Sequence, residues 1–324
     1  MRYYPDASGS LTYPEVNHAI ESVFAEHGRG HVQMPPKIYI TFPEGDFRTM
    51  PASIPAMNLA GVKIVNVHPG NPAHGLPTVM ATIILIDPDT GVQTALIDAT
   101  ALTDMRTGAA GAVAAQYLAE KRPLRIGLVG SGRQAEAQLH ATAAACDIEE
   151  VIVWSRRREN ADRFAGLFTC ADSGFPISAV STIEEACNCD LLITTTPSRE
   201  PLIRSEWIQP RTHINAIGAD APGKQELDPA LLARAEVFVD DYEQAIHSGE
   251  VNVPISSGVY SADRIAGTLG EVVIGEKERR SADAITIFDS TGLAVQDLAI
   301  ARIVVERMEG EEIGEKARFM QPAP

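Results

Sequence analysis

The chain has 324 residues and a formal net charge of −16 at pH 7, and its length is about twice that of an average domain. Hydrophobic residues make up 45% and charged residues 22%, which excludes wholesale disorder. The acidic excess argues against nucleic acid as a partner, because phosphate backbones require a basic surface. No segment reaches the ~18 apolar residues of a membrane span and no signal peptide opens the chain, so we expect a cytoplasmic protein that does not bind membranes.

The first hundred residues alternate in the manner of β-strands after a short helix at residues 13–27. Strands are expected at residues 38–42, 62–67, 82–86 and 93–97. Ile38, Ile40 and Phe42 share one face of the first of them, and residues 87–91 have the composition of a hairpin turn. This part predicts an antiparallel sheet with one or two helices.

From about residue 100 the pattern changes to a regular alternation of strands and helices. An Ala-rich helix is expected at residues 101–119 and a final helix at residues 292–308. Strands are expected at residues 125–129, 151–154, 177–180, 191–195, 213–217, 237–240 and 285–288. Such alternation favours a parallel sheet covered by helices on both faces.

A glycine-rich turn joins the first of these strands to a helix, with the pattern Gly-x-Gly-x-x-Ala at residues 130–135. Gly130 permits a tight turn, Gly132 lets the backbone approach a pyrophosphate, and Ala135 lets the helix pack on the strand. The pattern follows a strand and opens a helix in a βαβ series, which is the context that a dinucleotide-binding loop requires.

Lysine is scarce, which makes Lys63 informative: it lies in the segment 61–67, which is otherwise apolar on both faces. A buried lysine there would have a lowered pKa suited to proton transfer or carbonyl polarisation. The alternative is a lysine that extends from a strand edge into solvent. The pattern does not separate the two.

Three further cations, Lys37, Arg48 and Arg106, stand in apolar or small-residue surroundings. Cations that converge on one pocket would hold a carboxylate, whereas singly each would be a solvated surface charge. Asp220 closes an expected strand, where it is either catalytic or the cap of the next helix. Ser290 follows the last strand and would contact a nicotinamide amide or cap a helix. The histidines are scattered and suggest no metal site.

Taken together, these residues resemble the ornithine cyclodeaminase/μ-crystallin family over nearly the whole chain, in particular its archaeal alanine dehydrogenase branch. The blocks that carry the resemblance are residues 33–37, 50–52, 67–72, 75–80, 106–110, 194–198, 218–227 and 288–292.

The resemblance implies a Rossmann domain, a doubly wound parallel sheet at residues 113–300, and a smaller α+β domain for dimerisation and substrate at residues 1–112 with 301–324. Homodimers of the family close their β layers into a shared barrel. Lys63 and Asp220 match the family's catalytic lysine and aspartate, and Lys37 and Arg106 match residues near the substrate carboxylate and the nicotinamide. Cofactor contacts are expected at Arg106, Thr107, Gly130, Gly132, Arg133, Gln134, Ser155, Arg156, Arg157, Thr195, Thr196, Pro197, Gly218, Lys224 and Ser290.

Ornithine cyclodeaminases place a glutamate two residues before the shared Met-Pro, where this chain has Arg48, as the alanine dehydrogenases do. An arginine would repel the side-chain amine of ornithine and would bind a carboxylate. We therefore expect an amino-acid dehydrogenase that reversibly converts L-alanine to pyruvate and ammonium. The alternatives are a cyclic ketimine reductase or ornithine cyclodeaminase, and a μ-crystallin-like NADPH-binding protein.

The second strand of the parallel series ends at Ser155, where an NAD-selective site usually has Asp or Glu, and Arg156, Arg157 and Arg158 follow. Arginine pairs bidentately with phosphate. The sequence therefore predicts a preference for NADP(H), with NAD(H) as the alternative, because related alanine dehydrogenases with an aspartate here use NAD(H).

Overall fold

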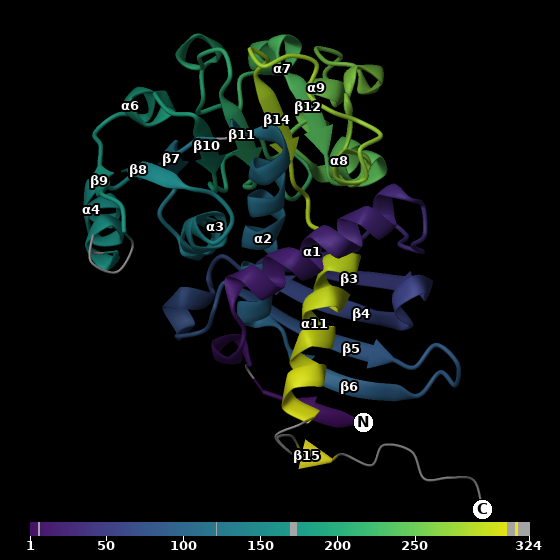
Figure 1. Ribbon diagram of the computed structural model, residues 1–324. Helices are drawn as coiled ribbons and strands as arrows, with labels where there is room; N and C mark the ends of the chain where they lie inside the picture. Colours follow the sequence, from purple (N-terminus) through teal and green to yellow (C-terminus); the bar gives the residue numbers. More distant parts are fainter. Residues whose placement is uncertain (6, 121, 169–173, 310–314, 317–324) are drawn as a thin grey trace, which may run out of the picture. The chain divides into compact units, whose positions relative to one another are not determined.

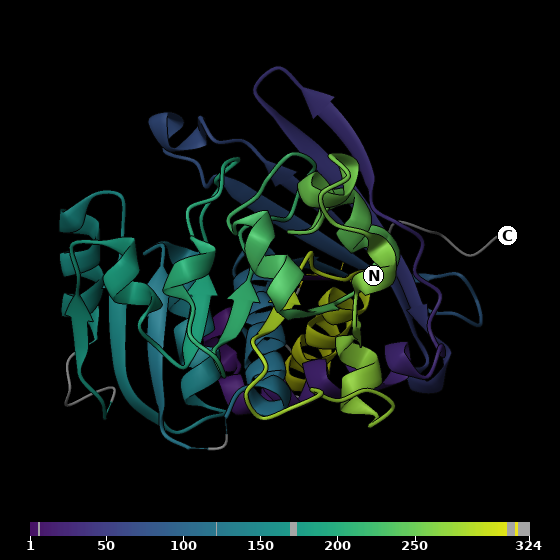
Figure 2. The same cartoon turned by 90° about the horizontal axis from the view of Figure 1, so that it is seen from above.

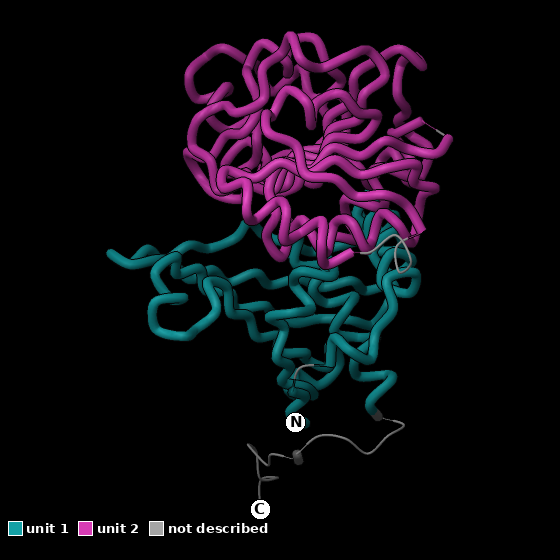
Figure 3. Tube along the Cα trace, turned by 90° about the vertical axis from the view of Figure 1, so that its left-hand side faces the viewer, with its two compact units in different colours: residues 1–106, 293–324 teal, residues 107–292 magenta. Residues whose placement is uncertain are grey.

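The computed structural model describes residues 1–5, 7–120, 122–168, 174–309 and 315–316. It divides into two compact units (Figure 3): unit 1 comprises Met1–Arg106 and Leu293–Pro324, and unit 2 comprises Thr107–Gly292. The dividing points expected from the sequence were after residues 112 and 300. In the structure the first division falls after Arg106, inside helix α2 (Thr100–Leu118), so no loop marks the boundary between the units.

Unit 1 is built on a seven-stranded sheet in the order β15-β1-β6-β5-β4-β3-β2 (Figure 1). Its strands are β1 (Arg2–Tyr4), β2 (Ile38–Phe42), β3 (Gly45–Ile54), β4 (Leu59–Val67), β5 (Val79–Ile86), β6 (Gln93–Asp98) and β15 (Glu315–Lys316), and its helices are α1 (Tyr13–Gly28) and α11 (Ala294–Glu309). The strands from β2 to β6 pair antiparallel as predicted, whereas β1 pairs parallel to β6. Helix α11 packs against α1 and against β3, β4 and β5 (Figures 1 and 2).

Strand β3 was not predicted, and Pro51 within it explains why. A proline cannot donate a ladder hydrogen bond and argues against a central strand. In the structure β2 pairs with β3 only as far as Thr49, while β4 pairs with the whole of β3. Pro51 therefore lies beyond the end of the β2 ladder, where the missing N–H breaks no bond to that strand.

Unit 2 is built on an eight-stranded parallel sheet in the order β13-β12-β14-β11-β10-β7-β8-β9 (Figure 1). Its strands are β7 (Leu124–Val129), β8 (Ile148–Trp154), β9 (Ile177–Ala179), β10 (Leu191–Thr194), β11 (His213–Ala216), β12 (Glu236–Val239), β13 (Gly267–Thr268) and β14 (Thr286–Asp289). Its helices are α3 (Arg133–Ala143), α4 (Arg158–Leu167), α6 (Ile183–Cys187), α7 (Pro229–Arg234), α8 (Tyr242–Ser248), α9 (Asn252–Ser256) and α10 (Leu269–Val273), with the greater part of α2.

The first five strands of unit 2, counted in chain order, stand across the sheet as 3-2-1-4-5, the order of a Rossmann sheet. Both faces are covered, because Leu191 and Ile193 of β10 belong to one buried cluster and Leu192 between them belongs to another. The predicted doubly wound α/β fold is confirmed. In such a sheet, ligands bind at the carboxyl ends of the strands where the order reverses, here between β7 and β10.

None of the helices formed by the described residues is long and apolar enough to cross a membrane. Cys146, Cys187 and Cys189 are free thiols, and Cys170 lies outside the described residues.

Candidate active site

Lys63 lies in the middle of β4, and its side chain is 1% exposed. Since β4 is paired on both sides, by β3 and β5, the interpretation of Lys63 as a solvated strand-edge lysine is wrong. Its Nζ donates a hydrogen bond to Oδ1 of Asp297 at 2.7 Å. Burial and, after it, the charge of Arg106 lower the pKa of Lys63 to about 7, although Asp297 acts in the opposite direction. A lysine with this pKa both accepts and donates a proton near neutral pH.

Asp297 on α11 is the site residue that the sequence analysis missed. It is 1% exposed, and its Oδ1 also lies 3.0 Å from Nε of Arg106, on α2. Nη1 of Arg106 donates to Oε1 of Gln296 at 3.0 Å, so two neighbouring residues of α11 hold this guanidinium. The available signal was a polar pair, Gln296 and Asp297, in a helix that is otherwise apolar between Leu293 and Leu298.

Arg48 lies on the same face of the sheet as Lys63. Strand β3 places Met50 opposite Lys63 and Arg48 opposite Val65, which makes Arg48 and Lys63 diagonal neighbours. Arg48 is 5% exposed, so its interpretation as a solvated surface charge is wrong. Its Nε donates to Oδ1 of Asp46 at 2.8 Å.

The guanidinium of Arg48 also lies over the ring of Tyr39, 5.2 Å from the ring centroid. Tyr39 pairs with Arg48 across the β2–β3 ladder, and Lys37 precedes Tyr39 by two residues. The charge of Lys37 is near enough to lower the pKa of Lys63. Unit 1 thus brings together all three candidate substrate-binding residues, Lys37, Arg48 and Arg106, around the catalytic candidate Lys63.

This cluster has more positive than negative groups. Lys63 and Arg106 share the single carboxylate of Asp297, and the other oxygen of that carboxylate, Oδ2, is buried without a hydrogen-bond partner among the described residues. Buried cations in excess are stabilised when an anionic ligand binds beside them and balances their charge. The arrangement suits a small carboxylate with an adjacent group that exchanges a proton with Lys63.

In unit 2 the glycine loop after β7 has the geometry that a dinucleotide requires. Gly130 has φ of 117°, and a Cβ added there would lie 2.4 Å from Oγ1 of Thr195, so only glycine fits. Gly132 precedes α3, and nothing lies within 4 Å of the position of its missing Cβ. The N-terminal amides of α3 have no side-chain cap among the described residues, which leaves them available to a phosphate.

Two hydroxyl groups at the carboxyl edge of the parallel sheet lack a hydrogen-bond partner. They are Oγ1 of Thr195, after β10, and Oγ of Ser290, after β14, and both atoms are buried without a partner among the described residues. Buried hydroxyls are normally satisfied, so both point to a polar ligand. The helix-capping alternative holds for neither Ser290 nor its neighbour Thr291, whose hydroxyl bonds to Asp240. The glycine loop, which suits a pyrophosphate, and the two unsatisfied hydroxyls together fit a nicotinamide dinucleotide.

The arginines after β8 do not behave alike. Arg158 begins α4 and is committed to protein partners, donating to Asp162 at 2.9 Å and to Ser181 at 2.9 Å. Arg156 and Arg157 are exposed, and no ion pair joins either to another described residue. Ser155 directly follows Trp154, the last residue of β8, so no carboxylate lies at the end of this strand.

Asp220 follows β11 and accepts a hydrogen bond on Oδ1 from Nζ of Lys224 at 2.5 Å. The helix-cap interpretation of Asp220 is wrong, because α7 begins only at Pro229 and is capped by Asp228. The predicted catalytic aspartate and the predicted cofactor-binding lysine thus form an ion pair in the same loop.

The remaining cofactor candidates also lie in unit 2. Arg133 and Gln134 form the first turn of α3, and the carbonyl of Thr107 on α2 accepts from Nε2 of Gln138 at 2.9 Å. Thr196 and Pro197 follow β10, and Gly218 follows β11, so both segments lie at the carboxyl edge of the sheet. No cluster of metal-ligating side chains occurs in the described part of the chain.

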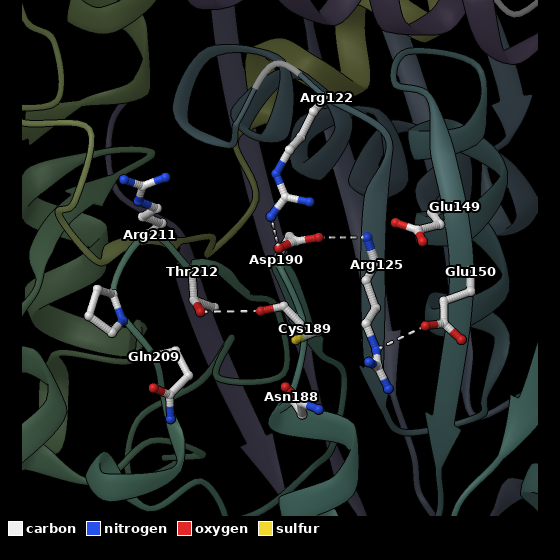
Figure 4. A pocket seen from close by; sticks show the side chains of 11 residues that line it. Arg122, Arg125, Glu149, Glu150, Asn188, Cys189, Asp190, Gln209, Arg211 and Thr212 are labelled. Carbon is white, nitrogen blue, oxygen red and sulfur yellow. Dashed lines mark hydrogen bonds and ion pairs between the residues drawn. The ribbon is translucent and has the colours of Figure 1, made fainter.

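A polar cavity lies at the opposite edge of the same sheet, at the amino ends of β7 and β11 (Figure 4). Arg122 in its wall pairs with Asp190 at 2.5 Å. Arg125 pairs with Glu150 at 3.2 Å, and Arg211 has a carboxylate partner as well. Because each of these arginines has a carboxylate partner among the described residues, the cavity offers no unpaired cation to an ionic ligand, and we assign it no function.

Comparison with known proteins identifies the family to which the chain is similar. A model of the ornithine cyclodeaminase/mu-crystallin family matches residues 5–312. The chain is 49% identical over 312 residues to an alanine dehydrogenase of Archaeoglobus fulgidus, with 96% of this chain and 95% of the relative covered. It is 36% identical over 316 residues to an iminosuccinate reductase of Paracoccus denitrificans, with 97% and 98% covered.

Two solved structures have the same fold over almost their whole length. One is an archaeal alanine dehydrogenase dimer with bound NAD, with a TM-score of 0.95, 47% identity and 99% of both chains covered. The other is the Δ1-pyrroline-2-carboxylate reductase of Thermococcus litoralis with NADH and L-proline, with a TM-score of 0.93, 33% identity and 98% and 100% covered. By the extent of these matches, this chain belongs to the ornithine cyclodeaminase/mu-crystallin family.

Proposed function

We propose that this protein is a nicotinamide-dependent amino-acid dehydrogenase that interconverts L-alanine and water with pyruvate and ammonium. The observation that carries the proposal is the buried cluster of Lys63, Arg106 and Asp297, with Arg48 on the same face of the sheet. It combines an excess of cations, which suits a carboxylate, with a lysine that titrates near neutral pH. The 49% identity to an alanine dehydrogenase supports this choice of substrate.

Lys63 acts on the oxygen of the substrate carbonyl. In the direction of amination its ammonium donates a hydrogen bond to that oxygen and supplies the proton that the oxygen takes up when ammonia adds. In the direction of oxidation, neutral Lys63 takes this proton back. Asp297 holds Nζ of Lys63 in place through the 2.7 Å hydrogen bond and so fixes the direction from which the proton is delivered.

Lys37, Arg48 and Arg106 bind the substrate carboxylate and so orient Cα. Asp220 removes the proton from the water that attacks the imine, and in the reverse direction it protonates the hydroxyl group, which then leaves as water. The nicotinamide cofactor, when bound, supplies or accepts the hydride. The glycine loop at Gly130 and Gly132 and the hydroxyls of Thr195 and Ser290 hold it.

A second candidate is reduction of a preformed imine, either cyclic or derived from a dicarboxylic acid. The observation that favours it is the similarity to an iminosuccinate reductase and to a Δ1-pyrroline-2-carboxylate reductase. A dicarboxylic imine would use Arg48 for its second carboxylate. Ornithine cyclodeamination fits less well, because Arg48 would repel the distal ammonium. A protein that only binds the cofactor would need neither the buried lysine nor its carboxylate partner.

The ammonium dependence of cofactor oxidation separates these candidates. We would follow the absorbance of NADH and NADPH with pyruvate, 2-oxobutyrate and oxaloacetate, each with and without ammonium, and with Δ1-pyrroline-2-carboxylate. The proposal expects the highest kcat/KM for pyruvate and an absolute requirement for ammonium. A higher kcat/KM for the cyclic imine or for oxaloacetate would identify the protein as the corresponding reductase instead of an alanine dehydrogenase. Cofactor binding without turnover would favour a protein that only binds the cofactor.

We further propose that the cofactor is NADP(H) rather than NAD(H). Arg156 and Arg157 are exposed beside a strand end that has Ser155 in place of a carboxylate. One charge-assisted contact to a 2′-phosphate contributes ~1.5–3 kcal/mol, or ~10–100-fold in affinity. The solved alanine dehydrogenase contains NAD, so the proposal predicts a difference between the two proteins. We expect kcat/KM for NADPH to exceed that for NADH, and Ser155→Asp to invert the order.

Arg158→Gln is the matched control for the cofactor preference, because Arg158 is committed to Asp162. Arg157→Gln is expected to lower kcat/KM for NADPH and to leave that for NADH little changed, whereas Arg158→Gln is expected to alter neither. A wild-type protein that prefers NADH by tenfold would show that these arginines do not bind the 2′-phosphate.

Arg48→Gln is expected to raise KM for pyruvate by ~10–100-fold, the effect of losing one charge-assisted contact of ~1.5–3 kcal/mol. The control is Arg29→Gln, which removes an exposed arginine paired with Glu26 and should leave KM unchanged. Steady-state kinetics at saturating ammonium and cofactor measure both. An unchanged KM would mean that Arg48 only supports Asp46 and Tyr39.

We also propose that the protein is a homodimer. On the β2 strand at the sheet edge, Ile38 is 60% exposed, Ile40 47% and Phe42 42%, all on one face. Ile64 and Ile84 lie half-buried on the same face of the sheet. Apolar surface of this extent on a sheet face favours association with a second copy, and the solved alanine dehydrogenase is a dimer.

Val65, Ile83 and Leu85, in contrast, need no partner subunit, because all three are buried within the chain, on the sheet face that carries Lys63. Light scattering at micromolar concentration should give about twice the chain mass of 34.8 kDa. Ile40→Lys should dissociate the dimer, whereas Val92→Lys, a substitution at an exposed residue of the β5–β6 turn, should not. A stable and active particle of the chain mass would contradict the dimer.

A further inference from the structure

Glu226 is a fully buried carboxylate that no role proposed so far uses. It is 0% exposed and lies in unit 2, between β11 and α7. Burying a carboxylate is costly unless charge or hydrogen bonds compensate for the lost water. The described residues provide no ion pair for Glu226, so its hydrogen bonds must supply the compensation.

Four donors surround the Glu226 carboxylate, and all come from the carboxyl edge of the parallel sheet. Oε1 accepts from the backbone N–H of Thr196 and from its hydroxyl, each at 2.7 Å. Oε2 accepts from the hydroxyl of Thr194 at 2.7 Å and from the backbone N–H of Gly218 at 2.9 Å. The side chain therefore ties the segment after β10 to the segment after β11.

The fit at Gly218 is close. A Cβ added there would lie 2.1 Å from the carbonyl oxygen of Thr196 and 2.5 Å from Oε2 of Glu226. The segments after β10 and β11 are thus drawn together around one side chain, with no space for a larger residue. Thr195, whose hydroxyl lies against Gly130 of the phosphate loop, is flanked on both sides by residues that Glu226 holds.

The backbone of Glu226 is anchored as well. Its N–H and that of Leu227 donate to Oε1 of Glu250, at 3.0 and 2.7 Å, and its carbonyl accepts from the backbone N–H of Leu202 at 2.7 Å. Glu250 itself is fully buried. Burial raises the pKa of both carboxyls, and that of Glu250 lies well above its usual range because Glu226 is beside it.

We propose that Glu226 is a positioning residue for the dinucleotide: it sets the spacing of the β10 and β11 segments and so holds the unpartnered hydroxyl of Thr195 beside the glycine loop, ready to bond to the cofactor. The inference rests on the proposed binding of a nicotinamide cofactor, and it does not depend on which amino or imino acid is the substrate. Glu226 acts through these two segments and needs no contact with the cofactor itself.

Glu226→Gln is a sharp test, because each carboxylate oxygen accepts one backbone N–H. An amide has a single oxygen, so its NH₂ group would face the N–H of either Thr196 or Gly218, and one of these donors would lose its acceptor. Glu250→Gln is the matched control. Both backbone donors reach Oε1 of Glu250, so an amide oxygen at that position keeps both bonds and gives up only the second contact of the Glu226 N–H, with Oε2 at 3.0 Å.

The first measurement is the dissociation constant of NADH and NADPH by fluorescence titration of the full-length protein. We expect Glu226→Gln to raise it by roughly 10–100-fold, the consequence of losing a hydrogen bond to a charged group, and Glu250→Gln to change it little. At saturating cofactor, KM for the keto acid should stay the same in both variants. Amide hydrogen exchange should quicken at Thr196 and Gly218 in Glu226→Gln while exchange in β7 stays slow.

Equal effects of the two substitutions on cofactor affinity, or exchange that quickens throughout unit 2, would overturn the positioning role and leave only a contribution to stability. Cofactor affinity unchanged in Glu226→Gln would overturn it too. A wild-type protein that binds neither NADH nor NADPH would instead contradict the proposed function, so the two failures are distinguishable.

Discussion

Replacing Lys63 with alanine is expected to lower kcat by ~10²–10⁴-fold, the usual contribution of a positioned general acid or base. The side chain is 1% exposed and bonded to Asp297, so alanine removes both the proton donor and the group that polarises the carbonyl. The dissociation constant of the cofactor should change little, because the glycine loop belongs to unit 2. Lys63→Arg should fail as well, since a guanidinium does not titrate near neutral pH.

The control for Lys63 is Lys277→Ala, which removes an exposed lysine and should leave kcat unchanged. The pH profile gives an independent check. Lys63 titrates at about 7, and amination requires the ammonium form, so the amination rate should fall as pH rises through 7. Oxidation requires the neutral form and should rise over the same range. Lys63→Ala with kcat within a few-fold of wild type would contradict the catalytic assignment.

Asp297→Asn is expected to have the second largest effect, on both stability and the pH profile. It keeps the shape of the side chain but leaves Lys63 and Arg106 buried without their shared anion. Removing one partner of a buried ion pair costs ~3–5 kcal/mol. Asp297 raises the pKa of Lys63 through its charge and its hydrogen bond, so the substitution should lower that pKa below 7. The amination profile should therefore shift to lower pH.

Urea unfolding and the pH dependence of kcat measure the two effects of Asp297→Asn. Glu306→Gln is the control on the same helix, because it removes an exposed partner of Arg302, and such surface pairs contribute only ~0–1 kcal/mol. If Asp297→Asn lost stability but kept the pH profile, Asp297 would be a structural ion-pair partner without influence on the protonation of Lys63.

The hairpin at residues 87–91 and the glycine loop at 130–135 were predictable because local sequence determines both. Asp87 accepts the turn hydrogen bonds from Gly91 and Asp89, and the backbone of Gly130, with φ of 117°, requires a glycine. Seven of the eight parallel strands of unit 2 were likewise found from their apolar runs, whereas the two-residue strand β13 was not. Strand β3 was missed because Pro51 opposes the assignment locally, and only the end of the β2 ladder at Thr49 makes it acceptable.

For the candidate site, the sequence indicated Lys63, Arg48 and Arg106 as unusual cations, but not their partners. The carboxylate that holds Lys63 is 234 residues away along the chain, and no local periodicity relates the two. Arg158 shows the same limit. It resembles its neighbours Arg156 and Arg157 in sequence, yet it is committed to Asp162 and Ser181.

The sequence by itself determined most of the strands and helices in their order, the phosphate-binding loop and the family, because these follow from periodicity, backbone requirements and short motifs. Tertiary structure alone decided whether Lys63 is buried, what its pKa is and which carboxylate it meets. The physical reason is that a pKa depends on lost hydration and on charges within a few ångströms. Those charges come from Lys37, just before β2, from α2 and from α11, which only folding brings around β4.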